Sequence, residues 1–173
     1  MAKNGMMRRA AIGLRRLAAG AALLAAATTG ALAPQAATAG PSAEAAARAI
    51  PKLGVGDLVN RERAARGLRP LGRDGRLRAA AFRHAADMGL KGFFDHRGSD
   101  GTHHGHRIAA QGFRACLAAE NIAWGQRSAQ EVVRGWMGSP GHRKIILHPR
   151  ASAYGAGYHP TRRQWVLVVA SPC

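Results

Sequence analysis

The last part of the chain contains a run of five apolar residues that a globular domain has to bury. Residues 165–169 read Trp-Val-Leu-Val-Val. An edge strand usually alternates apolar and polar residues, whereas an uninterrupted apolar run of this length is typical of a strand covered on both faces. The run therefore predicts a strand at the centre of a sheet.

The remaining periodic segments predict helices before this strand. Asp74 and Ser128 stand where an N-cap is expected, and Glu131 follows Ser128 at the spacing of a capping box. We expect helices over 57–66, 74–90, 128–138 and 142–147, a short helix through Ile108 and Ala110, and strands over 120–125, 153–158 and 164–170. This order predicts an α+β fold, a three-layer α/β/α sandwich around a small central antiparallel sheet.

Helical spacing also predicts which side chains are buried. In the first helix, Leu58, Val59 and Ala65 are expected to face inward, and residues 61–63 (Arg-Glu-Arg) are expected to face water. In the second helix the inward stripe includes His84. Two interpretations of His84 stay open: a hydrogen-bonded core histidine or a ligand.

The first 39 residues have the features of a signal peptide. Basic residues are followed by the apolar stretch 17–33, and Ala37-Thr38-Ala39 supplies the small-x-small cleavage pattern. A retained anchor is the alternative, but the apolar stretch is shorter than the roughly 20 residues of a membrane span. We therefore predict a signal peptide over 1–39, a linker or short N-terminal helix over 40–53, one domain over 54–173, and no transmembrane segment after cleavage.

The exported part is strongly basic. Five of the 26 Lys and Arg residues and none of the nine Asp and Glu residues fall in the leader, which leaves a net charge of +12 on residues 40–173. Such a charge predicts salt-sensitive binding to anionic envelope polymers or lipids. A solvated basic surface without a dedicated partner is the alternative. No module for specific nucleic-acid binding is visible.

The two cysteines, Cys116 and Cys173, both fall in the exported part. An oxidising compartment favours a disulfide between them, although two free thiols remain an alternative. The bridge would join the last residue to the loop before Glu120. Its closure of a long loop would contribute about 4 kcal/mol in the chain-entropy model.

Three segments carry residues suited to a chemical site. They are Phe-Asp-His at 94–96, Ala-Glu-Asn-Ile-Ala at 119–123 and Trp-Met-Gly-Ser-Pro-Gly-His-Arg at 136–143. Two neutral imidazoles, His96 and His142, can hold a zinc ion, and a carboxylate such as Glu120 can act as a general base. Their separation along the chain does not by itself bring them together.

These segments, in this order, resemble the bacterial secreted type of the CAP superfamily, the cysteine-rich secretory, antigen 5 and pathogenesis-related proteins with an SCP domain. The resemblance extends from Leu58 to Ala170 and includes the Asn-x-x-Arg pattern at 60–63 and Gly155-x-Gly157. It implies that His96, His142 and Glu120 share a cleft, with Asn121 and Arg143 as cleft support. Two departures are Ser139, where many eukaryotic members have a second glutamate, and Ala119, which replaces a glycine.

The resemblance implies a secreted CAP-domain protein of the bacterial cell envelope or exterior, without defining one activity. We expect a monomer whose His/Glu cleft binds a divalent metal, with zinc as the favoured ion. Alternatives are a lipid- or sterol-binding module without catalysis, a metal-dependent hydrolase of protease type, a polymer binder, and a purely structural His-Glu-His network. The histidines at 103, 104 and 106 are expected to form an exposed polar loop.

Overall fold

The computed structural model describes residues 54–173. The predicted signal peptide and linker, residues 1–53, lie outside the described residues. The elements are α2 (Val55–Ala64), β1 (Gly72–Arg73), α3 (Gly75–Lys91), α4 (His104–Ala109), β2 (Ala115–Trp124), α5 (Ala129–Gly138), α6 (Pro140–Ile146), β3 (Ala153–His159), the 3-10 turn η1 (Thr161–Arg163) and β4 (Gln164–Pro172). None of the helices within 54–173 combines the length and the apolar character needed to cross a bilayer.

The apolar run at 165–169 forms the core of the sheet, as predicted. The strand order is β1-β3-β4-β2, so β4 pairs with β3 on one side and with β2 on the other, antiparallel in both cases. The first seven residues of β4, 164–170, are all buried. Strands β1 and β3 are parallel, so the sheet is mixed, and β1 is a strand that the sequence did not predict. A two-residue strand has no periodicity from which its pairing can be predicted.

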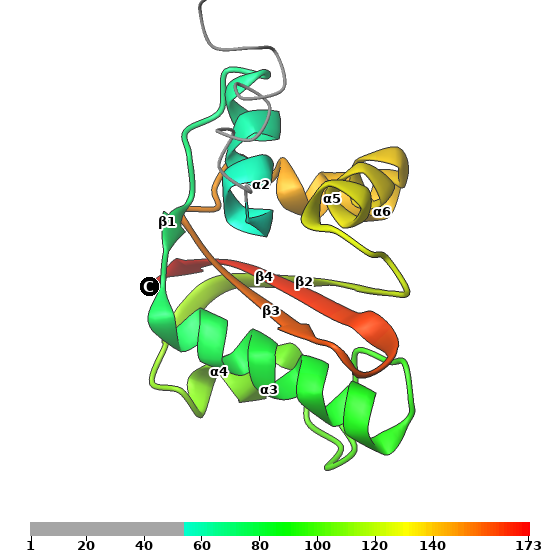
Figure 1. Ribbon diagram of the computed structural model, residues 1–173. Coiled ribbons are helices and arrows are strands. Elements are labelled where there is room, and N and C mark those ends of the chain that lie inside the picture. Colours follow the sequence, from blue (N-terminus) through cyan, green and yellow to red (C-terminus); the bar gives the residue numbers. More distant parts are fainter. Residues whose placement is uncertain (1–53) are drawn as a thin grey trace, which may run out of the picture. The chain divides into compact units, whose positions relative to one another are not determined.

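Helices cover both faces of this sheet, which confirms the three-layer sandwich (Figure 1). The odd-numbered residues 165–169 of β4 pack in one cluster with residues of α2, α5 and α6. The even-numbered residues 166–170 pack in a second cluster with α3 and α4. Because successive side chains of a strand point to opposite faces, the continuous apolar run supplies both cores.

Helix α3 lies unusually close to β3. A Cβ built on Gly155 would lie 2.1 Å from the backbone nitrogen of Arg78, and one on Gly157 would lie 2.4 Å from the carbonyl carbon of Ala81. The glycines are therefore required for the helix backbone to approach the strand.

The interpretation of the first helix was partly wrong. Arg63 is completely buried, and Ala65, predicted to face inward, is exposed. The Arg63 guanidinium donates through Nε to the carbonyl of Arg69 (2.9 Å) and through Nη1 to the carbonyls of Ile146 (2.8 Å) and His148 (3.0 Å). Burial lowers the pKa of Arg63. The side chain satisfies backbone acceptors at and just after the C-terminus of α6, where a cation is favourable.

The predicted capping of α5 holds for Ser128 and differs for Glu131. The Ser128 hydroxyl accepts a hydrogen bond from the Glu131 amide (3.1 Å), but the Glu131 carboxylate accepts from the amide of Arg127 (2.8 Å), not from that of Ser128. Helix α6 begins at Pro140, two residues before the predicted start, because proline is favoured in the first turn of a helix.

The predicted disulfide between Cys116 and Cys173 is present, with the Cα atoms 4.8 Å apart. Cys116 lies in β2 and not in a loop before Glu120, because β2 begins at Ala115. The bridge joins the beginning of β2 to Cys173, which directly follows β4. Strand β4 is the one with which β2 pairs.

We expect Gly157→Ala to destabilise the domain by about 1–3 kcal/mol, because the added methyl group forces α3 away from β3. Chemical unfolding monitored by circular dichroism measures the change. Gly135→Ala is the matched control, since nothing lies within 4 Å of a Cβ at that position and alanine favours the helix. Equal stability of the two variants would contradict the close approach of α3.

Candidate functional site

The predicted site is built around Glu120 in the middle of β2. Glu120 pairs with Val168 of β4, and its side chain lies on the sheet face covered by α3 and α4. The residue is only 4% exposed. A carboxylate in this setting needs a cation and hydrogen-bond donors to offset the loss of its hydration.

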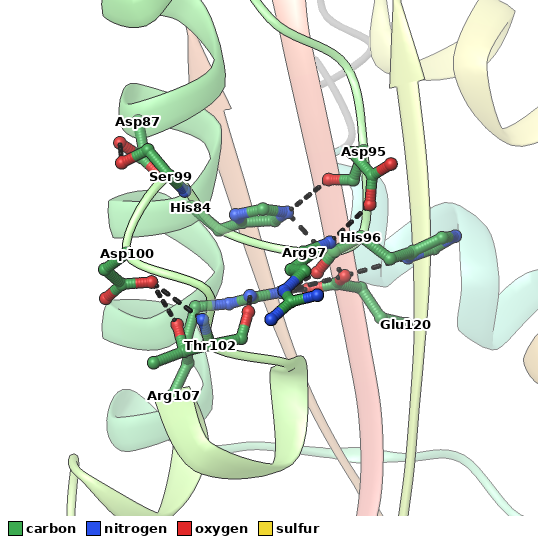
Figure 2. Close-up of polar contacts among 10 residues, drawn as sticks. All are labelled: His84, Asp87, Asp95, His96, Arg97, Ser99, Asp100, Thr102, Arg107 and Glu120. Atoms are coloured by element: carbon green, nitrogen blue, oxygen red, sulfur yellow. Dashed lines mark hydrogen bonds and ion pairs between the residues drawn. The ribbon is translucent and has the colours of Figure 1, made fainter.

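Arg107 of α4 supplies that cation. Its Nη2 donates to Oε2 of Glu120 at 2.8 Å and to Oε1 at 3.0 Å (Figure 2). The same guanidinium donates to the carbonyls of Thr102 (2.7 Å) and His96 (3.0 Å). Burial acts to raise the pKa of Glu120, but the hydrogen bond from His96 and the charge of Arg107 outweigh it and hold the pKa below its ordinary value.

His96 contacts the other side of the carboxylate. Its Nδ1 lies 2.9 Å from Oε1 of Glu120, and half of its side chain is exposed. The hydrogen bond to Glu120 raises the pKa of His96. Figure 2 shows the imidazole extending away from the carboxylate, with its second nitrogen on the far side of the ring.

His84 is a hydrogen-bonded core histidine, the first of the two interpretations. It is 1% exposed, and its Nε2 donates to the carbonyl of Asp95 at 2.9 Å. The same nitrogen lies 3.8 Å from Oε1 of Glu120. Burial lowers the pKa of His84, which favours the neutral ring. His84 thus holds the segment before His96 against α3.

His142 lies at the start of α6, on the side of the sheet opposite α3. The side chain of Asn121 donates to the carbonyl of His142 at 3.1 Å. Burial lowers the pKa of His142, and the charge of His96 acts in the same direction. Asn121 therefore ties the backbone of His142 to β2.

Arg143, the other predicted support residue, is exposed. Its Nη1 lies 3.4 Å from the carbonyl of Met137, near the end of α5, which is a long hydrogen bond. It links α6 to α5 and makes no hydrogen bond to Glu120, His96 or His142 among those found in residues 54–173.

Two further residues of the site were missed by sequence reasoning. Arg107 was not singled out, and His104 was placed in an exposed loop. His103 precedes α4 and His104 begins it, and His104 is half-buried; burial lowers its pKa, whereas the charge of Glu120 acts in the opposite direction. A buried carboxylate predicts a cationic partner, but many arginines are available and only the fold selects Arg107.

The arrangement offers two histidines rather than a closed metal cage. Within residues 54–173, no three or more His, Cys, Asp or Glu side chains converge as a metal site closed by protein ligands would require. A metal held by His96 and His142 would therefore keep coordination positions for other ligands, as catalytic and exchangeable sites do.

Comparison with known proteins identifies the family. Residues 57–171 match the family described as "Cysteine-rich secretory protein family", CAP. The chain belongs to the CAP family.

The chain is similar to YkwD of Bacillus subtilis (strain 168), with 38% identity over 109 residues that cover 63% of this chain and 42% of YkwD. The membrane protein YlbC of the same strain is 35% identical over 107 residues, 58% of this chain and 29% of YlbC. This chain thus covers less than half of the length of either relative.

Solved structures show the same CAP fold. An extracellular protein containing an SCP domain from Bacillus anthracis matches with a TM-score of 0.65 and 27% identity over 67% of this chain and 38% of that chain. An outer surface protein of Borrelia burgdorferi matches with a TM-score of 0.60 and 22% identity over 67% of this chain and 88% of that chain. The second likeness concerns the fold alone.

We expect Arg107→Met to destabilise this CAP domain by about 3–5 kcal/mol at neutral pH, because Glu120 is left buried without its cation. Urea unfolding measures the loss. Because the pKa of Glu120 is lowered in the folded protein, ionised Glu120 contributes to the free energy of unfolding at pH values above its ordinary pKa of 4.5. This contribution disappears as the pH falls through the lowered pKa.

The penalty of Arg107→Met should therefore shrink as the pH falls, since the variant's Glu120 can take up a proton. The double variant Arg107→Met/Glu120→Leu removes the unpaired charge and is expected to recover most of the lost stability. A penalty that is independent of pH, and that persists in the double variant, would show that Arg107 acts by packing alone.

Proposed function

We propose that this protein is an extracellular CAP domain of the bacterial envelope or exterior whose His96 and His142 bind a divalent metal ion, with zinc as the favoured ion. Glu120 acts as the carboxylate that orients His96. The observation that carries the proposal is the 2.9 Å hydrogen bond between Nδ1 of His96 and Oε1 of Glu120.

This hydrogen bond determines the tautomer of His96. An ionised carboxylate only accepts, so Nδ1 carries the proton, and in the neutral ring Nε2 then has a free lone pair. Metal-binding histidines commonly donate their second ring nitrogen to a carboxylate in this way, which fixes the ring and raises its basicity. The surroundings of His96 therefore suit its Nε2 atom to act as a metal ligand.

His142 supplies the second imidazole of the proposed site. Burial lowers its pKa, which favours the neutral form that binds metals. The hydrogen bond from Asn121 holds the backbone of His142 against β2, so the point at which the imidazole is attached to the backbone is fixed. When bound, zinc would supply Lewis-acid activation of a water molecule or carbonyl group.

The geometry favours an orienting role for Glu120 over the general-base role first predicted. Both carboxylate oxygens already accept hydrogen bonds from Arg107, and Oε1 also accepts from His96. With 4% exposure and a lowered pKa, Glu120 is a weak and poorly accessible base. Hydrolysis with Glu120 as base, and lipid or sterol binding without catalysis, remain predictions from the sequence.

Two findings support an extracellular location. The Bacillus anthracis structure similar to this domain, at 27% identity, is described as an extracellular protein. The disulfide between Cys116 and Cys173 is of a kind that persists in oxidising compartments outside the cytosol.

Zinc titration by calorimetry tests the metal site. We expect micromolar binding to the oxidised protein, lost in His96→Ala and in His142→Ala. Glu120→Gln should weaken binding about 10–100-fold, because an amide orients the ring less well. The melting temperature should rise with zinc in the parent protein and not in the two histidine variants.

His103→Ala is the matched control, since His103 is exposed and makes no contact with Glu120 among the hydrogen bonds of the described residues. Binding that survives both His96→Ala and His142→Ala, or that is lost in His103→Ala alone, would refute the site. An absence of zinc binding in the parent protein would leave His84, His96, Glu120 and Arg107 as a structural network.

Export is tested by the mass of the protein recovered from outside the cytoplasm. Cleavage after Ala39 predicts a mature chain that begins at Gly40, because residues 37–39 fit the signal-peptidase pattern. Intact-mass analysis of the extracellular and envelope fractions identifies the N-terminus. An uncleaved chain found only in the cytoplasm would contradict both the signal peptide and the proposed location.

A further inference from the structure

The outer edge of β3 is only partly paired. Strand β1 pairs with β3 at Ala153 and Tyr154, and β4 pairs with β3 over its whole length on the opposite side. Within residues 54–173, residues 155–159 of β3 have no strand on the β1 side. Figure 1 shows β1 beside the beginning of β3 only, with α3 running below the rest of the strand.

The free backbone groups on this edge can be assigned from the pairing with β1. The Gly72 amide donates to the carbonyl of Ser152 (2.8 Å), and the Asp74 amide donates to the carbonyl of Tyr154 (3.0 Å). Backbone groups of a strand face alternate sides with a period of two residues, and the register of β3 with β4 is continuous from 153 to 159. The amides and carbonyls of Ala156 and Tyr158 therefore point outward, beyond the end of β1.

A groove runs along this edge. A hollow of about 450 Å³ is lined by Arg78, Phe82 and Arg83 of α3 and by Ala156 and Tyr158 of β3. Phe82, on the α3 side, is 51% exposed, and Tyr158, whose ring lies 4.2 Å from that of Trp165 on the other face of the sheet, is 38% exposed. A smaller hollow of about 210 Å³ shares Arg78 and Ala156 with the first and extends toward β1.

The groove is cationic. Arg78 and Arg83 line the larger hollow, Arg73 lines the smaller one, and neither lining contains an aspartate or glutamate. None of the three arginines is in the ion pairs found within residues 54–173. Arg73 makes a long hydrogen bond to the hydroxyl of Tyr154 (3.3 Å), and the charge of Asp57 also acts on it.

We propose that this edge of β3 binds an extended acidic peptide segment of a partner protein, which adds to the sheet as a further strand. The outward amides and carbonyls of Ala156 and Tyr158 supply main-chain hydrogen bonds, the mode of strand addition. The arginines of α3 favour acidic side chains on their face of the added strand, and Tyr158 on the other face of the sheet favours the apolar side chains that alternate with them. A second copy of this chain is disfavoured, because its own edge carries the same positive charges.

This site is separate from the one in which His96 and His142 are proposed to bind metal, and it depends on no residue of that site. A peptide fits the groove better than a polysaccharide because the free groups of β3 repeat at the two-residue spacing of a strand. A polyanion held only by charge would need the arginines but not the backbone groups of Ala156 and Tyr158, and this difference separates the two by experiment.

Fluorescence anisotropy with a labelled peptide of alternating glutamate and valine tests the proposal on the full exported chain. We expect saturable binding, reduced at least about tenfold by Ala156→Pro, which removes one outward amide without removing a hydrogen bond to β4. Arg78→Glu should reduce binding to a similar extent. Arg134→Glu is the matched charge control, because Arg134 is exposed on α5 in the other helical layer.

Two further measurements identify the mode of binding. Amide hydrogen exchange should slow at Ala156 and Tyr158 when the peptide binds, with Gly157 unchanged because its amide faces β4. The same peptide with prolines in place of the valines should not bind, since it has fewer donors. Equal binding of the proline peptide, or binding without slower exchange at Ala156 and Tyr158, would overturn strand addition and leave a charge-driven surface. The exchange measurement also decides the matter if Ala156→Pro fails to fold.

Discussion

The buried carboxylate of Glu120 is the constraint on which the rest of the site depends. An edge strand of the sheet places this charge in the layer between the sheet and helices α3 and α4, where it cannot remain without compensation. Arg107 and His96 provide it with a cation and a second donor. Both come from the connection between α3 and β2, so one carboxylate fixes that connection against the sheet and determines where the ring of His96 lies.

The neighbouring residue connects the same strand to the opposite layer. Side chains of a strand alternate between faces, so Glu120 serves the layer of α3 and α4 while Asn121 reaches α6. The Asn121 amide holds the backbone of His142, whereas Glu120 holds the ring of His96. One dipeptide of β2 thus positions both histidines from opposite faces of the sheet. The metal binding proposed above would therefore use one histidine held from each face of the sheet.

Arginines of similar appearance in the sequence have different roles in the fold. Arg63 is buried and satisfies the carbonyls at and after the end of α6, and Arg107 balances Glu120. Arg73 and Arg78 stay at the surface, where they border the open edge of β3. Arginines that look alike in the sequence therefore include one that binds backbone carbonyls in the core, one that pairs with a buried carboxylate and two that line a cationic groove. Overall charge predicts attraction to anions, but it does not say which arginines remain available for it.

The sequence alone determined the elements with strong local signals. The apolar run at 165–169 predicted the central strand, Asp74 and Ser128 marked two helix starts, and the order of motifs identified the family and the candidate residues His96, Glu120 and His142. These features depend on residues close together in the chain or on a recurring pattern. Only the tertiary structure decided the parallel pairing of β1, the burial of Arg63 and the choice of Arg107 as the partner of Glu120. Each of these depends on contacts between segments far apart in the sequence, for which no local spacing carries a signal.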